Sequence, residues 1–202
     1  MADGCARIVG VLLAAGRGAR FDPGGDRLKL LEPASRGPNR GAPLAVAAAR
    51  ALRPAVDDLV AVVAPVAERG QPALHRLLAA EGCALVVNDR STDGQGSSIA
   101  FGIAAAAGAD GWIVALADMP AIATATAVAV VEALRGGAIT AAPSYRGRRG
   151  HPVGFARTLQ QELLALAGDV GARALLARHP PHLIEVDDPG VLFDVDTSED
   201  LR

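Results

Sequence analysis

Runs of consecutive apolar residues alternate along the chain with segments in which apolar residues recur at helical spacing. A strand covered on both faces is apolar throughout, whereas a strand with one solvated face alternates between apolar and polar residues. The runs predict strands at 7–16, 57–65, 83–89, 111–118 and 138–144, and the helical spacing predicts helices at 42–52, 72–82, 96–108 and 124–137. This order is typical of an α/β fold with helices on both faces of a mainly parallel sheet, a three-layer α/β/α arrangement.

The last third of the chain is less regular. Its pattern predicts strands at 151–156, 182–186 and 192–196, and helices at 157–166 and 171–179. No internal repeat, low-complexity tract or linker interrupts the pattern, so we interpret residues 1–202 as one domain.

Composition narrows the possible functions. Apolar residues make up 50% of the chain and aromatic residues only 3%, so the core must be built from Ala, Val, Leu and Ile. The net charge of −2 argues against a broad surface for nucleic acid or anionic membrane, and any bound anion must be met by a local site. Cys5 and Cys83 make no disulfide framework or metal cluster. No signal peptide or membrane-spanning run is evident, which predicts a cytoplasmic protein.

The segment after the first strand, AAGRGARFDPGGDRLK, indicates a phosphate-binding loop. Ligands of open parallel sheets bind beyond the carboxyl ends of the strands. Gly16 and Gly18 allow a tight turn that exposes N–H groups to an anion. Positive charge comes from Arg17, Arg20, Arg27 and Lys29, the only lysine in the chain.

This loop matches no standard nucleotide fingerprint. It is not a Walker A loop, because no Gly-Lys-Ser/Thr closes it, and Phe21 stands where a dinucleotide fingerprint has its third glycine. Taken alone, the loop is equally explained by a glycine-rich surface turn with solvated arginines.

Polar residues also follow the third and fourth strands. Asp118 comes where the fourth strand ends, and a carboxylate there can hold Mg²⁺ against a phosphate. Its alternative role is to cap a helix before Pro120. Ser97 and Ser98 in GQGSSI permit close approach of a flat group, or cap the helix that follows.

The remaining polar candidates lie near the end of the chain. Asp194 and Asp196 point the same way if 192–196 is a strand, and Thr197 with Asp200 forms a capping-box-like pair. His151 lies on a loop between glycine and proline. No Ser-His-Asp or Cys-His spacing is evident, so the chemistry indicated is phosphate plus Mg²⁺: phosphoryl or nucleotidyl transfer.

Five segments in this order, LLAAGRGARF with Lys29, GQGSSI, VALADMP, RGHPVGF and DVDTSEDL, resemble the signature blocks of the MobA-like nucleotidyltransferases. They cover about residues 8 to 202, and the nearest likeness is to the molybdenum cofactor cytidylyltransferases. The resemblance implies a Rossmann-like fold of the nucleotide-diphospho-sugar transferase type. It implies transfer of CMP, or less favourably GMP, from an NTP to a phosphate-bearing acceptor, with molybdopterin or molybdenum cofactor as acceptor.

The resemblance also implies roles for individual residues. Arg20 and Lys29 match basic residues that contact the phosphates, and Asp118 and Asp196 match two Mg²⁺ ligands. Ala15 stands where guanylyl-transferring relatives usually have glycine, which favours cytidine, and His151 belongs to the acceptor side. The expected nucleotide-contacting residues are Leu13, Ala14, Ala15, Gly16, Gly18, Gly96, Ser97 and Ser98. The implied partners are the NTP, with CTP favoured, the acceptor, and a molybdoenzyme or its chaperone.

The sequence departs from the family pattern at two places, and two other functions are compatible with it. The family spaces the loop arginine and lysine more closely, so residues 21–28 form an insertion, and residues 33–41 form another, which predicts a reshaped loop. GSS, RRGHP, GDVGARALL and DVDT are also similar to the nicotine blue oxidoreductase branch, which implies an NAD(P)H-dependent reductase on the same fold. A non-catalytic nucleotide-binding protein is the third reading.

Overall fold

The computed structural model describes residues 5–16, 18, 20–24, 26–168 and 171–201. Its centre is an eight-stranded sheet in the order β3-β2-β1-β4-β7-β5-β6, with β8 paired to β5. β1, β2, β3 and β4 pair in parallel, and β7 runs antiparallel to both of its neighbours. The strands are β1 (Ile8–Ala14), β2 (Asp58–Val63), β3 (Ala84–Val87), β4 (Gly111–Leu116), β5 (Thr140–Tyr145), β6 (Arg148–Arg149), β7 (Val153–Ala156) and β8 (His182–Glu185).

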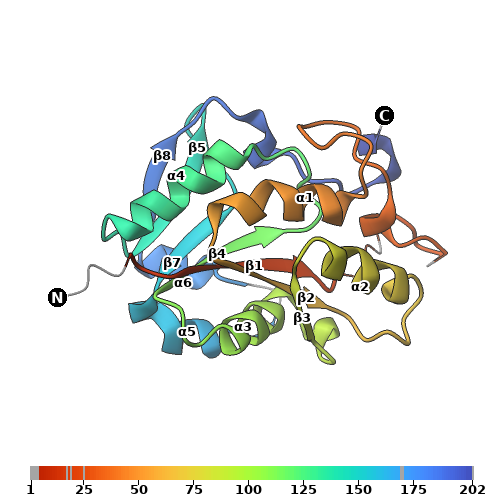
Figure 1. Ribbon diagram of the computed structural model, residues 1–202, viewed down its shortest axis with the longest axis horizontal. Helices are drawn as coiled ribbons and strands as arrows, with labels where there is room; N and C mark the ends of the chain where they lie inside the picture. The colour runs from red at the N-terminus through yellow and green to blue at the C-terminus, as the bar shows by residue number, and fades with distance from the viewer. Residues whose placement is uncertain (1–4, 17, 19, 25, 169–170, 202) are drawn as a thin grey trace.

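Helices cover both faces of this sheet (Figure 1). One face carries α1 (Leu44–Leu52), α2 (Gln71–Ala80) and α4 (Thr124–Arg135), and the other carries α3 (Gln95–Ala105), α5 (Gln160–Leu164) and α6 (Arg173–Arg178). The structure therefore confirms the mixed α/β fold with a mainly parallel sheet.

The order of the strands creates a switch point beside β1. From β1 the chain moves outward through β2 to β3, and it then returns by α3 to place β4 on the other side of β1. The connections that follow β1 and β4 lead to α1 and α4 on one face, whereas the connection that follows β3 leads to α3 on the other face. A cavity opens between these connections at the carboxyl ends of the strands, which is where open α/β sheets bind ligands.

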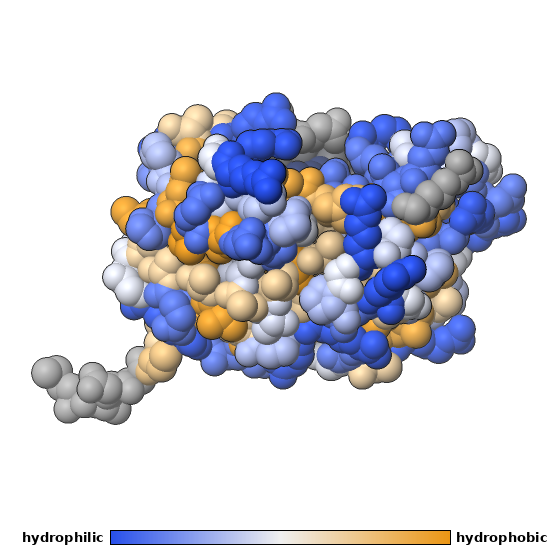
Figure 2. Space-filling model, turned by 90° about the horizontal axis from the view of Figure 1, so that it is seen from above, coloured by the Kyte–Doolittle hydropathy of each residue, from blue (hydrophilic) through white to orange (hydrophobic). Residues whose placement is uncertain are grey.

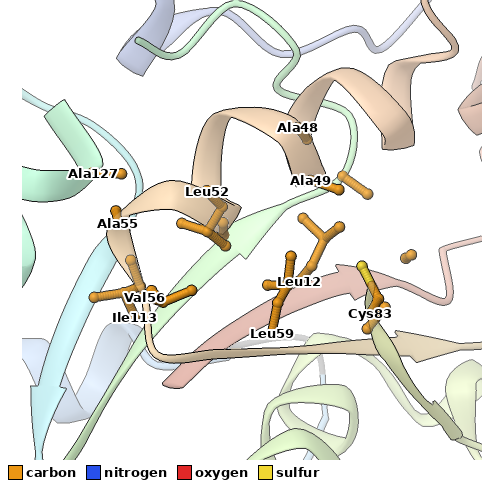
Figure 3. Packing of buried hydrophobic residues seen from close by; sticks show 14 of the residues in the cluster. Leu12, Ala48, Ala49, Leu52, Ala55, Val56, Leu59, Cys83, Ile113 and Ala127 are labelled. Atoms are coloured by element: carbon orange, nitrogen blue, oxygen red, sulfur yellow. The ribbon is translucent and has the colours of Figure 1, made fainter. Parts of the chain in front are cut away.

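Small residues allow the helices to lie close to the sheet. Figure 3 shows Ala48, Ala49 and Leu52 of α1 directed at Leu12 of β1 and at residues of neighbouring strands. On the opposite face, an ideal Cβ on Gly102 of α3 would collide with the side chain of Val11. The sparse aromatic content is thus compensated by close backbone approach rather than by large side chains.

Apolar and hydrophilic residues are unevenly distributed over the surface along the length of the molecule. Figure 2 shows apolar residues more often in the half nearer the N-terminus and hydrophilic residues over much of the opposite end, where the carboxyl ends of β1 and β4 lie in Figure 1. Within the described residues, no helix combines the length and the apolar character needed to cross a membrane.

Most predicted elements are present, and one is wrong. The strands and helices expected before residue 180 are found, with α5 shorter than expected and preceded by the 3-10 turn Arg157–Leu159. Residues 192–196 were expected to form a strand. Instead the 3-10 turn Pro189–Leu192 is followed by irregular backbone, because Val195 donates its N–H to the carbonyl of Asp118 and not to a strand.

Close packing at Gly102 predicts a large cost for a single methyl group. Gly102→Ala would force its Cβ against Val11 and within 3.1 Å of a Val62 methyl carbon, so we expect it to lower the free energy of unfolding by about 1–3 kcal/mol. Urea denaturation measures this change. Gly108→Ala is the control, since its Cβ would meet only the end of Arg7 at 3.8 Å. Equal stability of the two variants would contradict the packing argument.

Candidate active site

The connections after β1, β3 and β4 enclose a cavity of about 210 Å³ at the switch point. Its walls come from the end of β1, from the loop before α3 and from the end of β4. They are formed by Leu13, Ala15, Gly16, Ser91, Gly94, Gln95, Ser98, Leu116 and Asp118. The cavity therefore joins three of the five segments singled out in the sequence.

Lys29 and Asp118 form a nearly buried ion pair beside this cavity. Lys29 begins the 3-10 turn Lys29–Leu31 and is 7% exposed, and its Nζ donates to Asp118 Oδ2 at 2.7 Å. A buried ammonium is strongly disfavoured unless a carboxylate compensates it. Gly18, with φ of +64°, covers the lysine stem, because an ideal Cβ there would lie 3.2 Å from Lys29 Cβ.

The C-terminal segment closes over the same residues. The N–H of Val195 donates to the Asp118 carbonyl at 3.0 Å, and Arg20 Nη1 donates to Asp196 Oδ2 at 2.6 Å. Val195 is fully buried in a small cluster with Phe21 and Leu44. Residues separated by most of the chain are thereby held at one end of the sheet, and the predicted pairs Arg20/Lys29 and Asp118/Asp196 come together.

The three aspartates form an electronegative group. Burial raises the pKa of Asp194, and the charges of Asp196 and Asp118 raise it further, against a lowering effect of Lys29. No cluster of three or more His, Cys, Asp or Glu side chains among the described residues has the arrangement of a complete metal site. Asp118 at the cavity and Asp196 in the same group of aspartates nevertheless match the donor set of Mg²⁺, which takes one or two carboxylates and completes its shell with phosphate oxygens and water.

Asn88 fixes the loop that forms the floor of the cavity. Its side chain is fully buried and donates to the hydroxyls of Ser97 and Ser98 at 3.1 and 3.0 Å, while its own oxygen accepts from the Arg90 N–H. Ser97 in turn donates to the Gly94 carbonyl at 2.9 Å. Sequence reasoning missed Asn88, although its place directly after a strand and before a serine pair was a signal.

The predicted contact residues fall into two groups. Leu13, Ala15, Gly16 and Ser98 line the cavity with Asp118. The others support it: Ala14 faces the core, Gly18 covers Lys29, Ser97 braces its loop, and Gly96 packs against the backbone of Ala167. Arg17 lies outside the described residues.

A second cavity of about 170 Å³ adjoins the first, and both are lined by Gln95 and Leu116. His151, Arg149 and Arg173 contribute polar groups to its walls. Burial lowers the pKa of His151, and Arg149 lowers it further, against smaller raising effects of Asp118 and the Val114 backbone. His151 is accordingly neutral at pH 7.

A family model described as a MobA-like NTP transferase domain matches residues 10–183. The chain belongs to this family. It is a nucleotidyltransferase-type enzyme with a nucleotide-binding fold, as the resemblance in the sequence implied.

Individual proteins are similar to this MobA-like domain over nearly its whole length. Nicotine blue oxidoreductase of Paenarthrobacter nicotinovorans is 32% identical over 96% of this chain and 94% of its own. Rv0371c of Mycobacterium tuberculosis H37Rv is 30% identical, with a TM-score of 0.78 over 96% of this chain and 95% of that one. A structure of Rv0371c in complex with manganese gives a TM-score of 0.75 at 29% identity. A nucleotidyl transferase from Methanothermobacter, 23% identical with a TM-score of 0.76, covers 96% and 94% and shows the same fold.

The first insertion of this MobA-like domain is held by contacts among its own residues and with Glu32. Asp22 accepts from the N–H groups of Gly24 and Arg27 at 3.1 and 2.6 Å, which closes the segment into a compact loop. Arg27 pairs with Glu32 at 2.7 Å and lies over the Phe21 ring. The lysine thus contacts Asp118 although it stands nine positions after Arg20.

The second insertion supports the connection after Asp118. Residues 34–42 form a closed turn in which the N–H of Ala34 donates to Ala42 and the N–H of Gly41 donates to Ala34. Gly37 lies so close to Ala121 that an ideal Cβ would be 2.5 Å from its Cα, and Gly190 packs against Ala121 from elsewhere in the chain. The insertion therefore packs on the loop that carries Asp118.

The buried network of Asn88 predicts a coupled loss of stability and loop order. Asn88→Ala leaves two serine hydroxyls and the Arg90 N–H without their partner, so we expect a loss of about 1–3 kcal/mol of unfolding free energy. Amide hydrogen exchange should also become faster at 94–98. Asn39→Ala is the control, because it removes one 3.3 Å hydrogen bond from a half-buried side chain. Unchanged exchange at 94–98 in a destabilised Asn88→Ala protein would exclude the bracing role.

Proposed function

We propose that this single domain transfers CMP, and less readily GMP, from an NTP to a phosphate-bearing acceptor, molybdopterin or molybdenum cofactor, and releases pyrophosphate. The observation that carries the proposal is the buried Lys29–Asp118 pair beside the switch-point cavity. A lysine that is 7% exposed and a carboxylate at the end of a central strand are a costly arrangement for a surface turn. A cytoplasmic location and a molybdoenzyme or chaperone as recipient stay predictions from the sequence.

The proposed reaction is an in-line displacement. An oxygen of the acceptor phosphate attacks the α-phosphorus of CTP, a new P–O bond forms, and the bond from the α-phosphorus to the bridging oxygen breaks. The bonding electrons leave with pyrophosphate. The attacking phosphate is already ionised near pH 7, so no general base is needed. Catalysis then consists of positioning and charge neutralisation.

Different residues would bind the triphosphate, neutralise its charge and hold the metal. The glycine-rich loop after β1 offers backbone N–H groups to the triphosphate, and Lys29 and Arg20 neutralise its charge. Asp118 and Asp196 would hold Mg²⁺, which when bound neutralises the phosphates and the acceptor oxygen. Both carboxylates are paired with the two cations in the structure. Entry of an anionic nucleotide would draw Lys29 and Arg20 toward phosphate and free the carboxylates.

The choice of nucleotide rests on the shape of the first cavity. Leu13 and Ala15 line it on one side and Gly94 and Ser98 on the other. Ala15 supports cytidine as the favoured base, because the additional methyl group narrows the space available to a purine. Ser98 keeps its hydroxyl close to the cavity through Asn88.

The 32% identity to nicotine blue oxidoreductase favours a second candidate, an NAD(P)H-dependent reductase. One structural feature argues against it. A dinucleotide fold places the pyrophosphate at the N-terminus of a helix that begins within the glycine loop. Here Phe21 is buried in a small core and α1 begins only at Leu44. A non-catalytic nucleotide-binding protein would bind CTP without releasing pyrophosphate, so the turnover measurement below separates it from the enzyme.

Ligand binding separates the candidates. We expect CTP to bind at least tenfold more tightly with Mg²⁺ than with EDTA in titration calorimetry, because the metal relieves repulsion between the aspartates and the phosphates. Asp118→Asn should remove most of this difference, and the exposed control Asp187→Asn should retain it. NADPH should not saturate the protein at micromolar concentration. Equal CTP affinity in both buffers would count against the metal role, and tight NADPH binding with dye reduction would favour the reductase.

The lone lysine gives the second test. Lys29→Ala removes the charge expected to neutralise the departing pyrophosphate, so we expect kcat to fall by about 10²-fold. Lys29→Arg should fall between this variant and the parent, because a planar guanidinium cannot repeat the contacts of a compact ammonium. Pyrophosphate release with CTP, Mg²⁺ and molybdopterin is the measurement.

Arg27 is the matched control for this test. It lies two residues from Lys29 but is engaged by Glu32 and Phe21, so Arg27→Ala should keep near-parental turnover. The double variant should resemble Lys29→Ala alone. If Lys29→Ala turns over like the parent, with its fold intact by circular dichroism, the phosphate role of Lys29 is wrong.

A further inference from the structure

The polar side chains that line the second cavity are either positively charged or neutral. Seven of its eleven lining residues are apolar, and the polar ones are two arginines, one glutamine and the neutral His151. Its lining residues are Gln95, Ile99, Val114, Leu116, Arg149, His151, Val153, Phe155, Ala172, Arg173 and Leu176. Among the residues that the structure describes, no aspartate or glutamate lines it. A cavity with this lining favours an anion that carries a flat or apolar body.

The two arginines come from different elements, and each backbone is fixed. Arg149 belongs to β6 and pairs with Ser144 of β5, and the next residue, Gly150, packs so tightly on Val191 that a Cβ would collide. Arg173 begins α6, two residues after Gly171, whose ideal Cβ would lie 2.8 Å from Gln95 Oε1. The cavity therefore has cations supplied by two separately anchored walls.

Neither arginine is committed to a carboxylate within the described residues. The ion pairs there use other arginines, Arg178 of the same helix among them, which binds Glu162 at 2.6 Å. Both Arg149 and Arg173 are exposed. Guanidinium groups that are fixed at the base but free at the tip suit bidentate capture of a carboxylate or phosphate.

We propose that Arg149 and Arg173 bind an anionic group of the acceptor other than the phosphate that reacts, while its flat body lies against the apolar part of the wall, where Leu116 and Ala172 are partly exposed. This inference rests on the proposed function. The reacting phosphate must reach Asp118, which lines the first cavity and not the second. Because Gln95 and Leu116 line both cavities, one molecule can extend from the arginines to the nucleotide. The acceptor is then an elongated molecule that carries a second anionic group at a distance from its reacting phosphate.

The test uses pterin-6-carboxylate as a fluorescent probe with one flat body and one anionic group. It is titrated into the protein saturated with CTP and Mg²⁺. We expect saturable binding, and we expect Arg149→Ala and Arg173→Ala each to raise the Kd by about tenfold through loss of a charged hydrogen bond. Arg173→Lys should recover part of the affinity. The neutral analogue 6-hydroxymethylpterin should bind more weakly and change less than threefold in the same variants.

Arg148→Ala is the matched control. Arg148 is the other residue of β6 and does not line the cavity, so this variant should bind the probe like the parent. Parental affinity in the Arg149→Ala, Arg173→Ala double variant would overturn the proposal. So would displacement of the probe by CTP, equal binding of the neutral analogue, or no saturable probe binding by the parent protein.

Failure of this inference can be distinguished from failure of the proposed function. CTP affinity should be unchanged in Arg149→Ala and Arg173→Ala, because neither residue lines the first cavity. A parent protein that binds the probe but not CTP would contradict nucleotidyl transfer and leave the anion site standing. A parent protein that binds CTP with Mg²⁺ but not the probe would contradict the anion site and leave nucleotidyl transfer standing.

Discussion

A buried ammonium must have a carboxylate beside it, and this requirement organises the end of the sheet at which the site lies. Lys29 reaches Asp118 from the loop after β1, so that loop and the end of β4 are held together at the switch point. The Asp118 carbonyl in turn receives the N–H of Val195. Loop, strand and C-terminal segment therefore depend on one pair. A guanidinium is larger and planar, and the contact of Gly18 with the lysine stem leaves it little room.

Much of the fold could be predicted because a strand covered on both faces has a distinctive apolar run. The cavity at the switch point follows from that topology, since parallel strands bring their carboxyl ends to one edge. The wrong strand at 192–196 has a physical cause. DVD alternates like a strand, but Val195 is drawn into the small core with Phe21, and its N–H is used by Asp118. The alternation of apolar and polar residues does not show whether a backbone N–H bonds to a neighbouring strand or, as at Val195, to the carbonyl of a loop residue.

Other features of the site could not be predicted because their signals are common in any sequence. An asparagine after a strand usually ends it, and nothing in NDR reveals that Asn88 is fully buried and bonded to two serines. The insertion at 33–41 is polar and rich in glycine and proline, as surface loops are. Its contact with Ala121, through a glycine that leaves no space for a side chain, exists only in three dimensions. Arg173 was likewise hidden within a short helix.

The proposed function requires a protein with a net charge of −2 to bring two anions together. Two like-charged phosphates repel strongly as they approach, and a uniformly basic surface would attract many other anions as well. Here the cations are local: Lys29 and Arg20 pair with Asp118 and Asp196, and Arg149 and Arg173 line the second cavity. His151, in the wall of the same second cavity, is neutral and adds no charge. Under the proposed function, the first two cations would neutralise the nucleotide phosphates, and the two arginines would hold the acceptor by an anionic group other than the reacting phosphate.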